Sequence, residues 1–155
     1  MLFRSRSGTE NVAGIVGIGA ACELAAARLN ELAPRLAQMR DRFERGLAGL
    51  CATVFGAGAA RIPNTSYFAL EGIDGETLVV ELDKAGFAVA SGATCSSAST
   101  EPSASLLAMG IAPEVARGAV RDSVGAANTP AEIDAFLSAL SATAQRLRQL
   151  TAMAV

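Results

Sequence analysis

The sequence contains no histidine, and Lys84 is its only lysine among 155 residues. Without histidine, this chain alone cannot supply a histidine general base, a Ser–His–Asp triad or a histidine-ligated metal. A single lysine leaves one candidate for Schiff-base chemistry. Lys84 stands in the segment Asp83-Lys84-Ala85, where we expect an ordinary solvated charge at the C-terminal end of a helix.

Cysteine is also scarce, with three residues and no CxxC pair. An odd number of widely spaced cysteines argues against a disulfide framework or a zinc site, and it favours a reducing, cytoplasmic compartment. No apolar run follows the basic N-terminal residues, so we expect no signal peptide. The apolar stretch over residues 12–27 is broken by glycines and Glu23, and it falls short of the ~20 apolar residues of a membrane span.

The composition is typical of one folded domain. Hydrophobic residues make up 51% and charged residues 18% of the sequence, and the net charge is −2. A nucleic-acid binder needs a basic face that neutralises phosphates, which this charge balance does not favour. We therefore expect residues 1–155 to form a single domain with neither nucleic acid nor a membrane as its partner.

A long helix is expected over residues 11–50, bent at Pro34, after an N-terminal segment over residues 1–10. Gly17-Ile18-Gly19 within it begins like a dinucleotide-binding fingerprint, but the third glycine and a preceding strand are missing, so close helix packing explains the glycines better. Apolar residues recur at helical spacing along the whole segment. This stripe consists of Val12, Ile15, Val16, Gly19, Cys22, Ala26, Leu29, Leu32, Leu36, Met39, Phe43, Leu47 and Leu50.

Residues 51–155 are expected to form a small α+β domain, in which helices cover one side of a small mixed sheet. Asp74 is the expected N-cap of one helix, and Thr129, Pro130 and Glu132 form a capping pattern for the last one. Residues 91–103 are almost all small or hydroxylic, which indicates a loop. Strands are expected over 51–55, 65–70, 87–90 and 119–124, and helices over 75–85, 103–109 and from 130 onward, with a helical turn at 113.

The three cysteines differ in their surroundings. Cys22 belongs to the apolar helical stripe and Cys51 adjoins a strand, so we expect both to be small core residues. Cys95 stands in the loop of small residues, where backbone N–H groups and neighbouring hydroxyls can stabilise a thiolate. The composition of this loop leaves two interpretations open, a reactive nucleophile or a merely exposed thiol.

Arg121 is the one cation in a stretch of small and apolar residues, Gly118-Ala119-Val120-Arg121. A guanidinium in such a place can bind a carboxylate through two parallel hydrogen bonds. The alternative is a structural salt bridge to Asp122 or Glu114. The residues alone do not decide between a ligand-binding and a structural role.

The loop Ser-Gly-Ala-Thr-Cys-Ser-Ser-Ala-Ser-Thr-Glu-Pro-Ser over residues 91–103 resembles the active-site loop of NifS-like cysteine desulfurases. These are pyridoxal-phosphate (PLP) enzymes of the aspartate-aminotransferase fold type. The resemblance extends over residues 6–150 and corresponds to the C-terminal part of a family member. The other matching segments occur in the family's order and are Arg6-Ser7-Gly8-Thr9, Pro63-Asn64-Thr65, Asp74-Gly75-Glu76, Val120-Arg121-Asp122-Ser123-Val124-Gly125, and Thr129 with Glu132 and Ile133.

The resemblance implies a role for four residues. Cys95 would be the nucleophile that takes the sulfur of L-cysteine as a persulfide, releases alanine and passes the sulfur to an acceptor such as an iron–sulfur scaffold. Arg121, with Asn64 of the Pro-Asn turn, would bind the substrate, and Arg121 would hold its α-carboxylate. Thr9 would bond the PLP phosphate in the site of the neighbouring subunit, which implies a homodimer.

The resemblance also shows what this sequence does not contain. The family's large PLP-binding domain, its Schiff-base lysine and the adjacent histidine have no match, so we expect the chain alone to be incomplete and not to bind PLP stably. Asp122 replaces an aromatic residue of the family, and Ala126 replaces a frequent arginine. Two alternatives remain: a stand-alone, non-catalytic domain that acts as a sulfur carrier or partner-binding module, and a split enzyme completed by another polypeptide.

Overall fold

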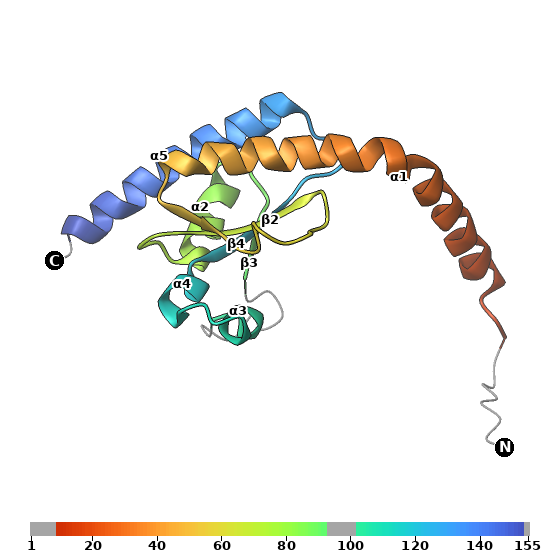
Figure 1. The fold of residues 1–155 in the computed structure, drawn as a ribbon, viewed down its shortest axis with the longest axis horizontal. Coiled ribbons are helices and arrows are strands. Elements are labelled where there is room, and N and C mark those ends of the chain that lie inside the picture. Colours follow the sequence, from red (N-terminus) through yellow and green to blue (C-terminus); the bar gives the residue numbers. More distant parts are fainter. Residues whose placement is uncertain (1–8, 93–101, 154–155) are drawn as a thin grey trace, which may run out of the picture.

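The computed structural model describes residues 9–92 and 102–153 (Figure 1). Within these ranges the chain forms helices around a four-stranded sheet, which agrees with the expected α+β class. The elements are α1 (Val12–Gly46), the 3-10 turn η1 (Leu47–Gly49), β1 (Ala52–Val54), β2 (Thr65–Leu70), α2 (Gly75–Lys84), β3 (Ala90–Ser91), α3 (Ala104–Ala108), α4 (Pro113–Arg117), β4 (Ala119–Ser123) and α5 (Pro130–Met153).

The sheet has the strand order β1-β2-β4-β3, and every pair in it is antiparallel. The expectation of a mixed sheet was therefore wrong, because none of the described strand pairs is parallel. The alternation of side chains along a strand shows which residues share a face, but it does not show the direction of the neighbouring strand. In the central pair, Phe68 of β2 lies opposite Val120 of β4, and both side chains are fully buried.

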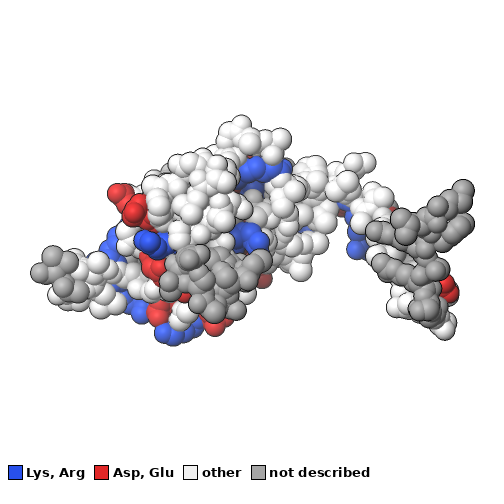
Figure 2. Space-filling model, turned by 90° about the horizontal axis from the view of Figure 1, so that it is seen from below, with Lys and Arg blue, Asp and Glu red and all other residues white. Residues whose placement is uncertain are grey.

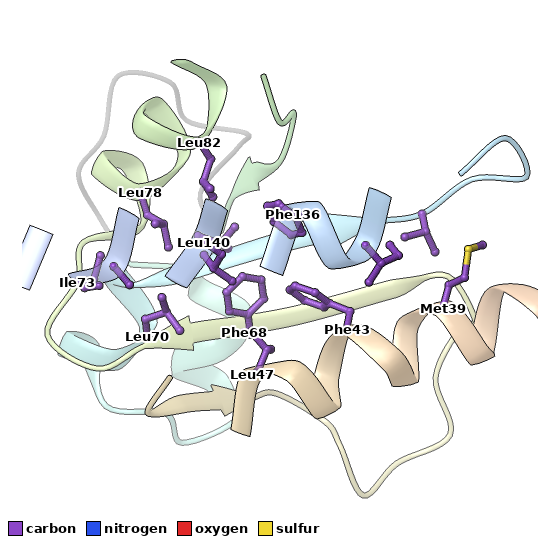
Figure 3. Packing of buried hydrophobic residues seen from close by; sticks show 14 of the residues in the cluster. Met39, Phe43, Leu47, Phe68, Leu70, Ile73, Leu78, Leu82, Phe136 and Leu140 are labelled. Atoms are coloured by element: carbon purple, nitrogen blue, oxygen red, sulfur yellow. The ribbon is translucent and has the colours of Figure 1, made fainter. Parts of the chain in front are cut away.

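The main hydrophobic core fills the space between one face of this sheet and the helices α1, α2 and α5 (Figure 3). At its centre the ring of Phe43 from α1 packs against Phe68 in an edge-on contact and stacks on Phe136 of α5, each with a centroid distance of 5.3 Å. A second, smaller cluster on the opposite face joins α3 and α4 to the sheet through Leu106, Ala116 and Ala119. The helical cover thus extends beyond one side of the sheet.

Helix α1 confirms the expected long helix and contains Pro34, but only its C-terminal part is buried, at Leu36, Met39 and Phe43. All residues from Thr9 to Glu31 are exposed. Figure 1 shows this N-terminal part of the helix turning away from the sheet and projecting from the body of the molecule. The apolar stripe is therefore continuous in the sequence but covered by other elements over only part of its length.

Two expected core residues are corrected by this arrangement. Cys22 is exposed because it lies on the projecting part of α1. Cys51 is exposed because it occupies the turn between η1 and β1, with a left-handed φ of 53°. Helical periodicity identified the face on which Cys22 lies, but burial also requires another element to cover that face.

The projecting helix also changes the expectation about a membrane span. Residues Val12–Gly49 form one helical segment that is long and apolar enough to cross a membrane, judged by length and composition alone. Its most apolar window is not buried at all in the structure. Counting the glycines as interruptions underestimated the apolar length of this helix.

The helix caps follow the sequence closely. Asp74 Oδ1 accepts the N–H of Thr77 at 2.9 Å and begins α2. The backbone N–H of Thr129 donates to Glu132 Oε2 at 2.7 Å, while the N–H of Glu132 donates back to Thr129 Oγ1 at 3.3 Å. This reciprocal pair satisfies free backbone donors at the start of α5, as its sequence pattern predicts.

The strand expected over residues 87–90 is shorter than predicted. Only Ala90 and Ser91 pair with β4, opposite Arg121 and Val120. Residues 86–89 run towards β3 without strand pairing, and a cavity separates them from the end of β4.

Candidate functional site

The sheet face opposite the main core carries the guanidinium of Arg121. Helices α3 and α4 cover part of this face, and the uncovered part around Arg121 is its open face. Because side chains alternate along the strand, Arg121 points away from the main core, whereas its neighbours Val120 and Asp122 are buried on the core side. Arg121 is exposed, and in residues 9–92 and 102–153 it forms no ion pair. The salt bridge to Asp122 or Glu114, one of the two sequence interpretations, is thus not formed in these ranges.

Tyr67 connects Arg121 with the beginning of the cysteine loop. The two residues are direct partners on β2 and β4, so their side chains share the open face. The Tyr67 hydroxyl donates to the carbonyl oxygen of Gly92 at 3.4 Å, and the Gly92 N–H donates to the carbonyl of Ala119 at 2.8 Å. Residues 93–101, which include Cys95, lie outside the described residues. Gly92, the last described residue before this segment, is thus held by hydrogen bonds to Ala119 and to Tyr67, the strand partner of Arg121.

Sequence reasoning missed Tyr67, although it is the only tyrosine of the chain. Its position inside a regular alternating strand favours an ordinary structural residue. Its register with Arg121 is a property of strand pairing, which the sequence pattern does not contain. The ring also packs edge-on against Phe55 with a centroid distance of 5.2 Å, and this contact limits its orientation.

Asn64 lies at the start of β2, where its side chain extends the pairing with β4. Its Nδ2 donates to the carbonyl of Val124 at 3.2 Å, and the Val124 N–H donates to the Asn64 carbonyl at 2.9 Å. The hydroxyls of Thr65 and Ser123 meet one step further along at 3.3 Å. Asn64 and Arg121 therefore lie along the same pair of strands, and the amide has a clear structural role there.

Thr9 is not brought near these residues. It is exposed and precedes Asn11, the N-cap of α1. Figure 1 shows this end of α1 far from the sheet that carries Arg121. Thr9 and Arg121 are therefore not brought together in this structure.

Lys84 does not have the surroundings of a cofactor-binding lysine. Its Nζ pairs with Glu81 Oε1 at 2.7 Å, three residues earlier on α2, and its side chain is 66% exposed. Glu81 also pairs with Arg146 of α5. A Schiff-base amine is activated by burial or by nearby cations, whereas Lys84 is solvated and neutralised by a carboxylate. The residues that the structure describes therefore do not fit PLP on their own.

A separate cavity of about 750 Å³ lies at another part of the sheet, lined among others by Cys51, Asp74, Glu114 and Arg117. Thr9, Asn64 and Arg121, the predicted site residues within the described ranges, do not line it. No group of three or more metal-ligating side chains occurs in the described part of the chain. The candidate site is therefore the open face around Arg121 and Tyr67, and not this cavity.

Comparison with known proteins identifies what this arrangement is similar to. The model of the family "Aminotransferase class-V" matches residues 3–136. A cysteine desulfurase of Gluconacetobacter diazotrophicus is 41% identical over 148 residues, which are 94% of this chain and 37% of that protein. The cysteine desulfurase IscS of Clostridium botulinum is 39% identical over 150 residues, covering 94% of this chain and 38% of the relative.

Solved structures agree with these matches. One NifS-like protein superimposes with a TM-score of 0.73 and 33% identity, over 88% of this chain and 34% of the other. A NifS-like protein from Rickettsia africae gives a TM-score of 0.76 and 27% identity, over 89% and 36% of the two chains. The chain thus spans little more than a third of the length of the relatives that it matches.

Proposed function

This chain belongs to the class-V aminotransferase family, and on that premise we propose that it is the C-terminal portion of a cysteine desulfurase. The observation that carries the proposal is the Arg121 guanidinium, which has no ion pair in the described ranges and lies on the sheet face where Tyr67 holds Gly92, at the start of the cysteine loop. The identity of 41% to a cysteine desulfurase supports the same function.

In the complete enzyme, Arg121 would bind the α-carboxylate of L-cysteine and Asn64 would contribute to the same subsite. The Cys95 thiolate would attack the substrate sulfur. The carbon–sulfur bond breaks, Cys95 keeps the sulfur as a persulfide, and the carbon retains the electron pair and takes a proton to give L-alanine. An acceptor such as an iron–sulfur scaffold protein would then receive the sulfur.

The PLP chemistry of such an enzyme would come from residues outside this chain. The chain has no histidine, and its one lysine is paired with Glu81 in solvent. We therefore propose that the chain alone neither holds PLP stably nor turns over L-cysteine. When bound in a complete enzyme, PLP supplies the electron sink that weakens the substrate carbon–sulfur bond.

The projecting part of α1 supports the proposal that this chain is one part of a larger assembly. It exposes large apolar side chains, and exposed apolar surface of this kind marks an interaction site. We propose that it packs against the remainder of the enzyme or a second subunit, as in a homodimer where Thr9 reaches the neighbouring site. The reducing, cytoplasmic location proposed from the cysteines is compatible with a persulfide on Cys95. The exposed side chains are Val12, Ile15, Val16, Ile18, Leu24 and Leu29.

A chimera tests the proposal most directly. This chain replaces the corresponding region of the Gluconacetobacter diazotrophicus desulfurase, and alanine and sulfide formation from L-cysteine are measured. We expect an active chimera whose activity is abolished by Cys95→Ala and retained by the matched control Cys51→Ala. Arg121→Gln should raise the KM for L-cysteine by about tenfold or more, because a charge-assisted carboxylate contact is lost.

The same assays on the chain alone should show no alanine or sulfide release and no stable visible absorption after PLP addition. Steady turnover by the chain alone would contradict its incompleteness. A chimera that folds and holds PLP but is inactive would contradict the proposed function. Activity that survives Cys95→Ala would remove the role of that thiol.

A further inference from the structure

A second cavity, of about 370 Å³, lies where the segment before β3 separates from β4. Phe87 and Val89 line it from one side, Asp122 from the end of β4, and Ile133 and Phe136 from α5. Thr9, Asn64 and Arg121, the residues of the proposed function that the structure describes, do not line this cavity. It is therefore a separate place in the fold, on the core side of the sheet, whereas Arg121 lies on the open side.

The unusual member of this lining is Asp122. It is only 9% exposed, and the backbone N–H of Ser123 donates to its carboxylate. In the described part of the chain it forms no ion pair, although ionised carboxylates are rarely buried without a partner. Arg121, its neighbour in sequence, points to the opposite face of the sheet.

The charged groups on the surrounding elements do not neutralise Asp122. On α5, Glu132 also lines the cavity and carries the same sign of charge. On α1, Arg35 donates to the carbonyl oxygens of Ala126 and Asn128, at 2.9 Å each. Residues 86–91 contain no titratable side chain.

The polar and charged side chains on the other elements around Asp122 also have partners of their own. Ser66 lies opposite Asp122 on β2 and donates to Glu44 Oε1 at 2.9 Å. Glu44 in turn forms a two-hydrogen-bond pair with Arg61, at 2.7 and 3.0 Å. The one lysine, at the end of α2, is paired with Glu81.

The rest of the lining is suited to an alkyl chain. The rings of Phe87 and Phe136 are 5.3 Å apart between centroids, and Val89 and Ile133 add aliphatic surface. A buried carboxylate beside aromatic rings matches a cation that carries an apolar stem, because the rings attract cations and the stem fills apolar space. The described residues contain no group of three metal-ligating side chains, so a metal ion is not favoured.

We propose that this cavity binds a small primary amine in its ammonium form, with the ammonium group on Asp122 and the alkyl chain packed against the residues Phe87 and Phe136 that line it. Asn128 and Glu132 supply further acceptors in the lining. The site is independent of the proposed desulfurase function. It depends on the replacement of an aromatic residue of the family pattern by Asp122.

The titration of Asp122 supports this assignment. Burial raises the pKa of Asp122 from 3.8 to about 6, so the carboxylate is ionised at neutral pH, and the residues that the structure describes supply no counter-ion to it. An ammonium ion would supply the missing charge. Below pH 6 the carboxyl becomes protonated while an alkylammonium ion stays charged, so binding should weaken there.

The test uses n-butylammonium chloride as the probe and the whole ¹⁵N-labelled chain at constant ionic strength. At pH 7.5 we expect saturable amide shifts at Phe87, Val89, Ser123 and Ile133. Asp122→Asn should weaken binding by about tenfold or more, since a charge-assisted hydrogen bond is lost. The matched control, Asp83→Asn on the exposed side of α2, should leave it unchanged.

A pH series and a neutral probe keep the test independent of the variant. With a pKa of about 6, only about one tenth of Asp122 is ionised at pH 5, so the affinity of the wild-type chain should fall by about tenfold. Butan-1-ol should not produce the same saturable shifts. The proposal is overturned if the shifts do not saturate, if Asp122→Asn and the pH change leave the affinity unchanged, or if butan-1-ol binds equally well.

Discussion

At the scale of single residues, Asp122 makes stability depend on pH in an unusual direction. Its pKa is raised by burial, so the folded state holds the proton more tightly than the unfolded state does. The stability contribution is therefore largest at low pH and is lost as the pH rises from about 4 to about 6. Glu132 and Asp134 act oppositely, because hydrogen bonds from Thr129 and Arg42 lower their pKa values.

We predict that Asp122→Asn stabilises the chain at neutral pH. The difference between 3.8 and about 6 corresponds to about 2–3 kcal/mol of unfolding free energy at pH 7.5, and the gain should be small at pH 4. Urea unfolding at a series of pH values measures this. Asp134→Asn, which breaks an exposed ion pair with Arg42, is the control and should show no such gain. Equal stability of wild type and Asp122→Asn at pH 7.5 would contradict the burial of a charged carboxylate.

Cys51 provides a second residue-scale prediction. This residue is exposed in the turn before β1, so its thiol is accessible to reagents in the folded chain, contrary to the expected core position. We predict that Cys51 in the native chain is labelled by a thiol reagent at a rate within about tenfold of that in urea. Mass mapping of short labelling times measures the rates. Strong protection of Cys51 in the folded chain would show that the turn is covered.

At the scale of elements, the contact between α2 and the start of β4 depends on a glycine. A Cβ at Gly75 would lie 2.8 Å from the carbonyl oxygen of Ala119 and 2.9 Å from that of Arg117. Both atoms belong to the backbone and cannot rotate away. The Asp74-Gly75 start of α2 thus combines a helix cap with a close approach of two elements.

We predict that Gly75→Ala lowers the unfolding free energy by about 1–3 kcal/mol, because α2 must shift away from β4. Gly17→Ala is the matched control, since nothing lies within 4 Å of its added Cβ and alanine favours a helix. Thermal unfolding of both variants compares them. A Gly75→Ala variant as stable as Gly17→Ala would mean that α2 does not pack so closely.

At the scale of the whole molecule, the chain consists of a packed body and an uncovered helical extension. The body is held by the cluster around Phe43, Phe68 and Phe136 (Figure 3), whereas no residue from Thr9 to Glu31 is buried. Residues 12–27, which form most of the projecting part of α1, contain one charged side chain, Glu23; where Figure 2 leaves this part uncovered, it is mostly white. An apolar and weakly charged surface of this kind favours association.

We predict that the full chain forms a two-fold homo-oligomer through this helix, and that deleting residues 1–30 gives a monomer with nearly unchanged thermal stability. Light scattering at micromolar concentration measures the molar mass. Labelling of Cys22 adds a local measurement, because association should protect this exposed thiol as the concentration rises. A full chain that remains monomeric would contradict the prediction.

The local features of the fold could be predicted because they depend on neighbouring residues. Asp74 and Thr129 cap their helices through hydrogen bonds that span three residues. The strand over residues 65–70 was predicted with its observed bounds, since alternation and the Pro63-Asn64 turn are local signals. The order of motifs also indicated the family, which the match over residues 3–136 confirms.

What the sequence by itself determined is the set of elements, their caps and the family of the chain, because each depends on chemistry within a few residues. Only the tertiary structure decided which faces are covered. The stripe of α1 places Cys22 and Phe43 on apolar positions alike, but the sheet and α5 cover only Phe43. Pairing likewise placed Tyr67 beside Arg121 and buried Asp122, since register between distant strands depends on the packing of the whole molecule.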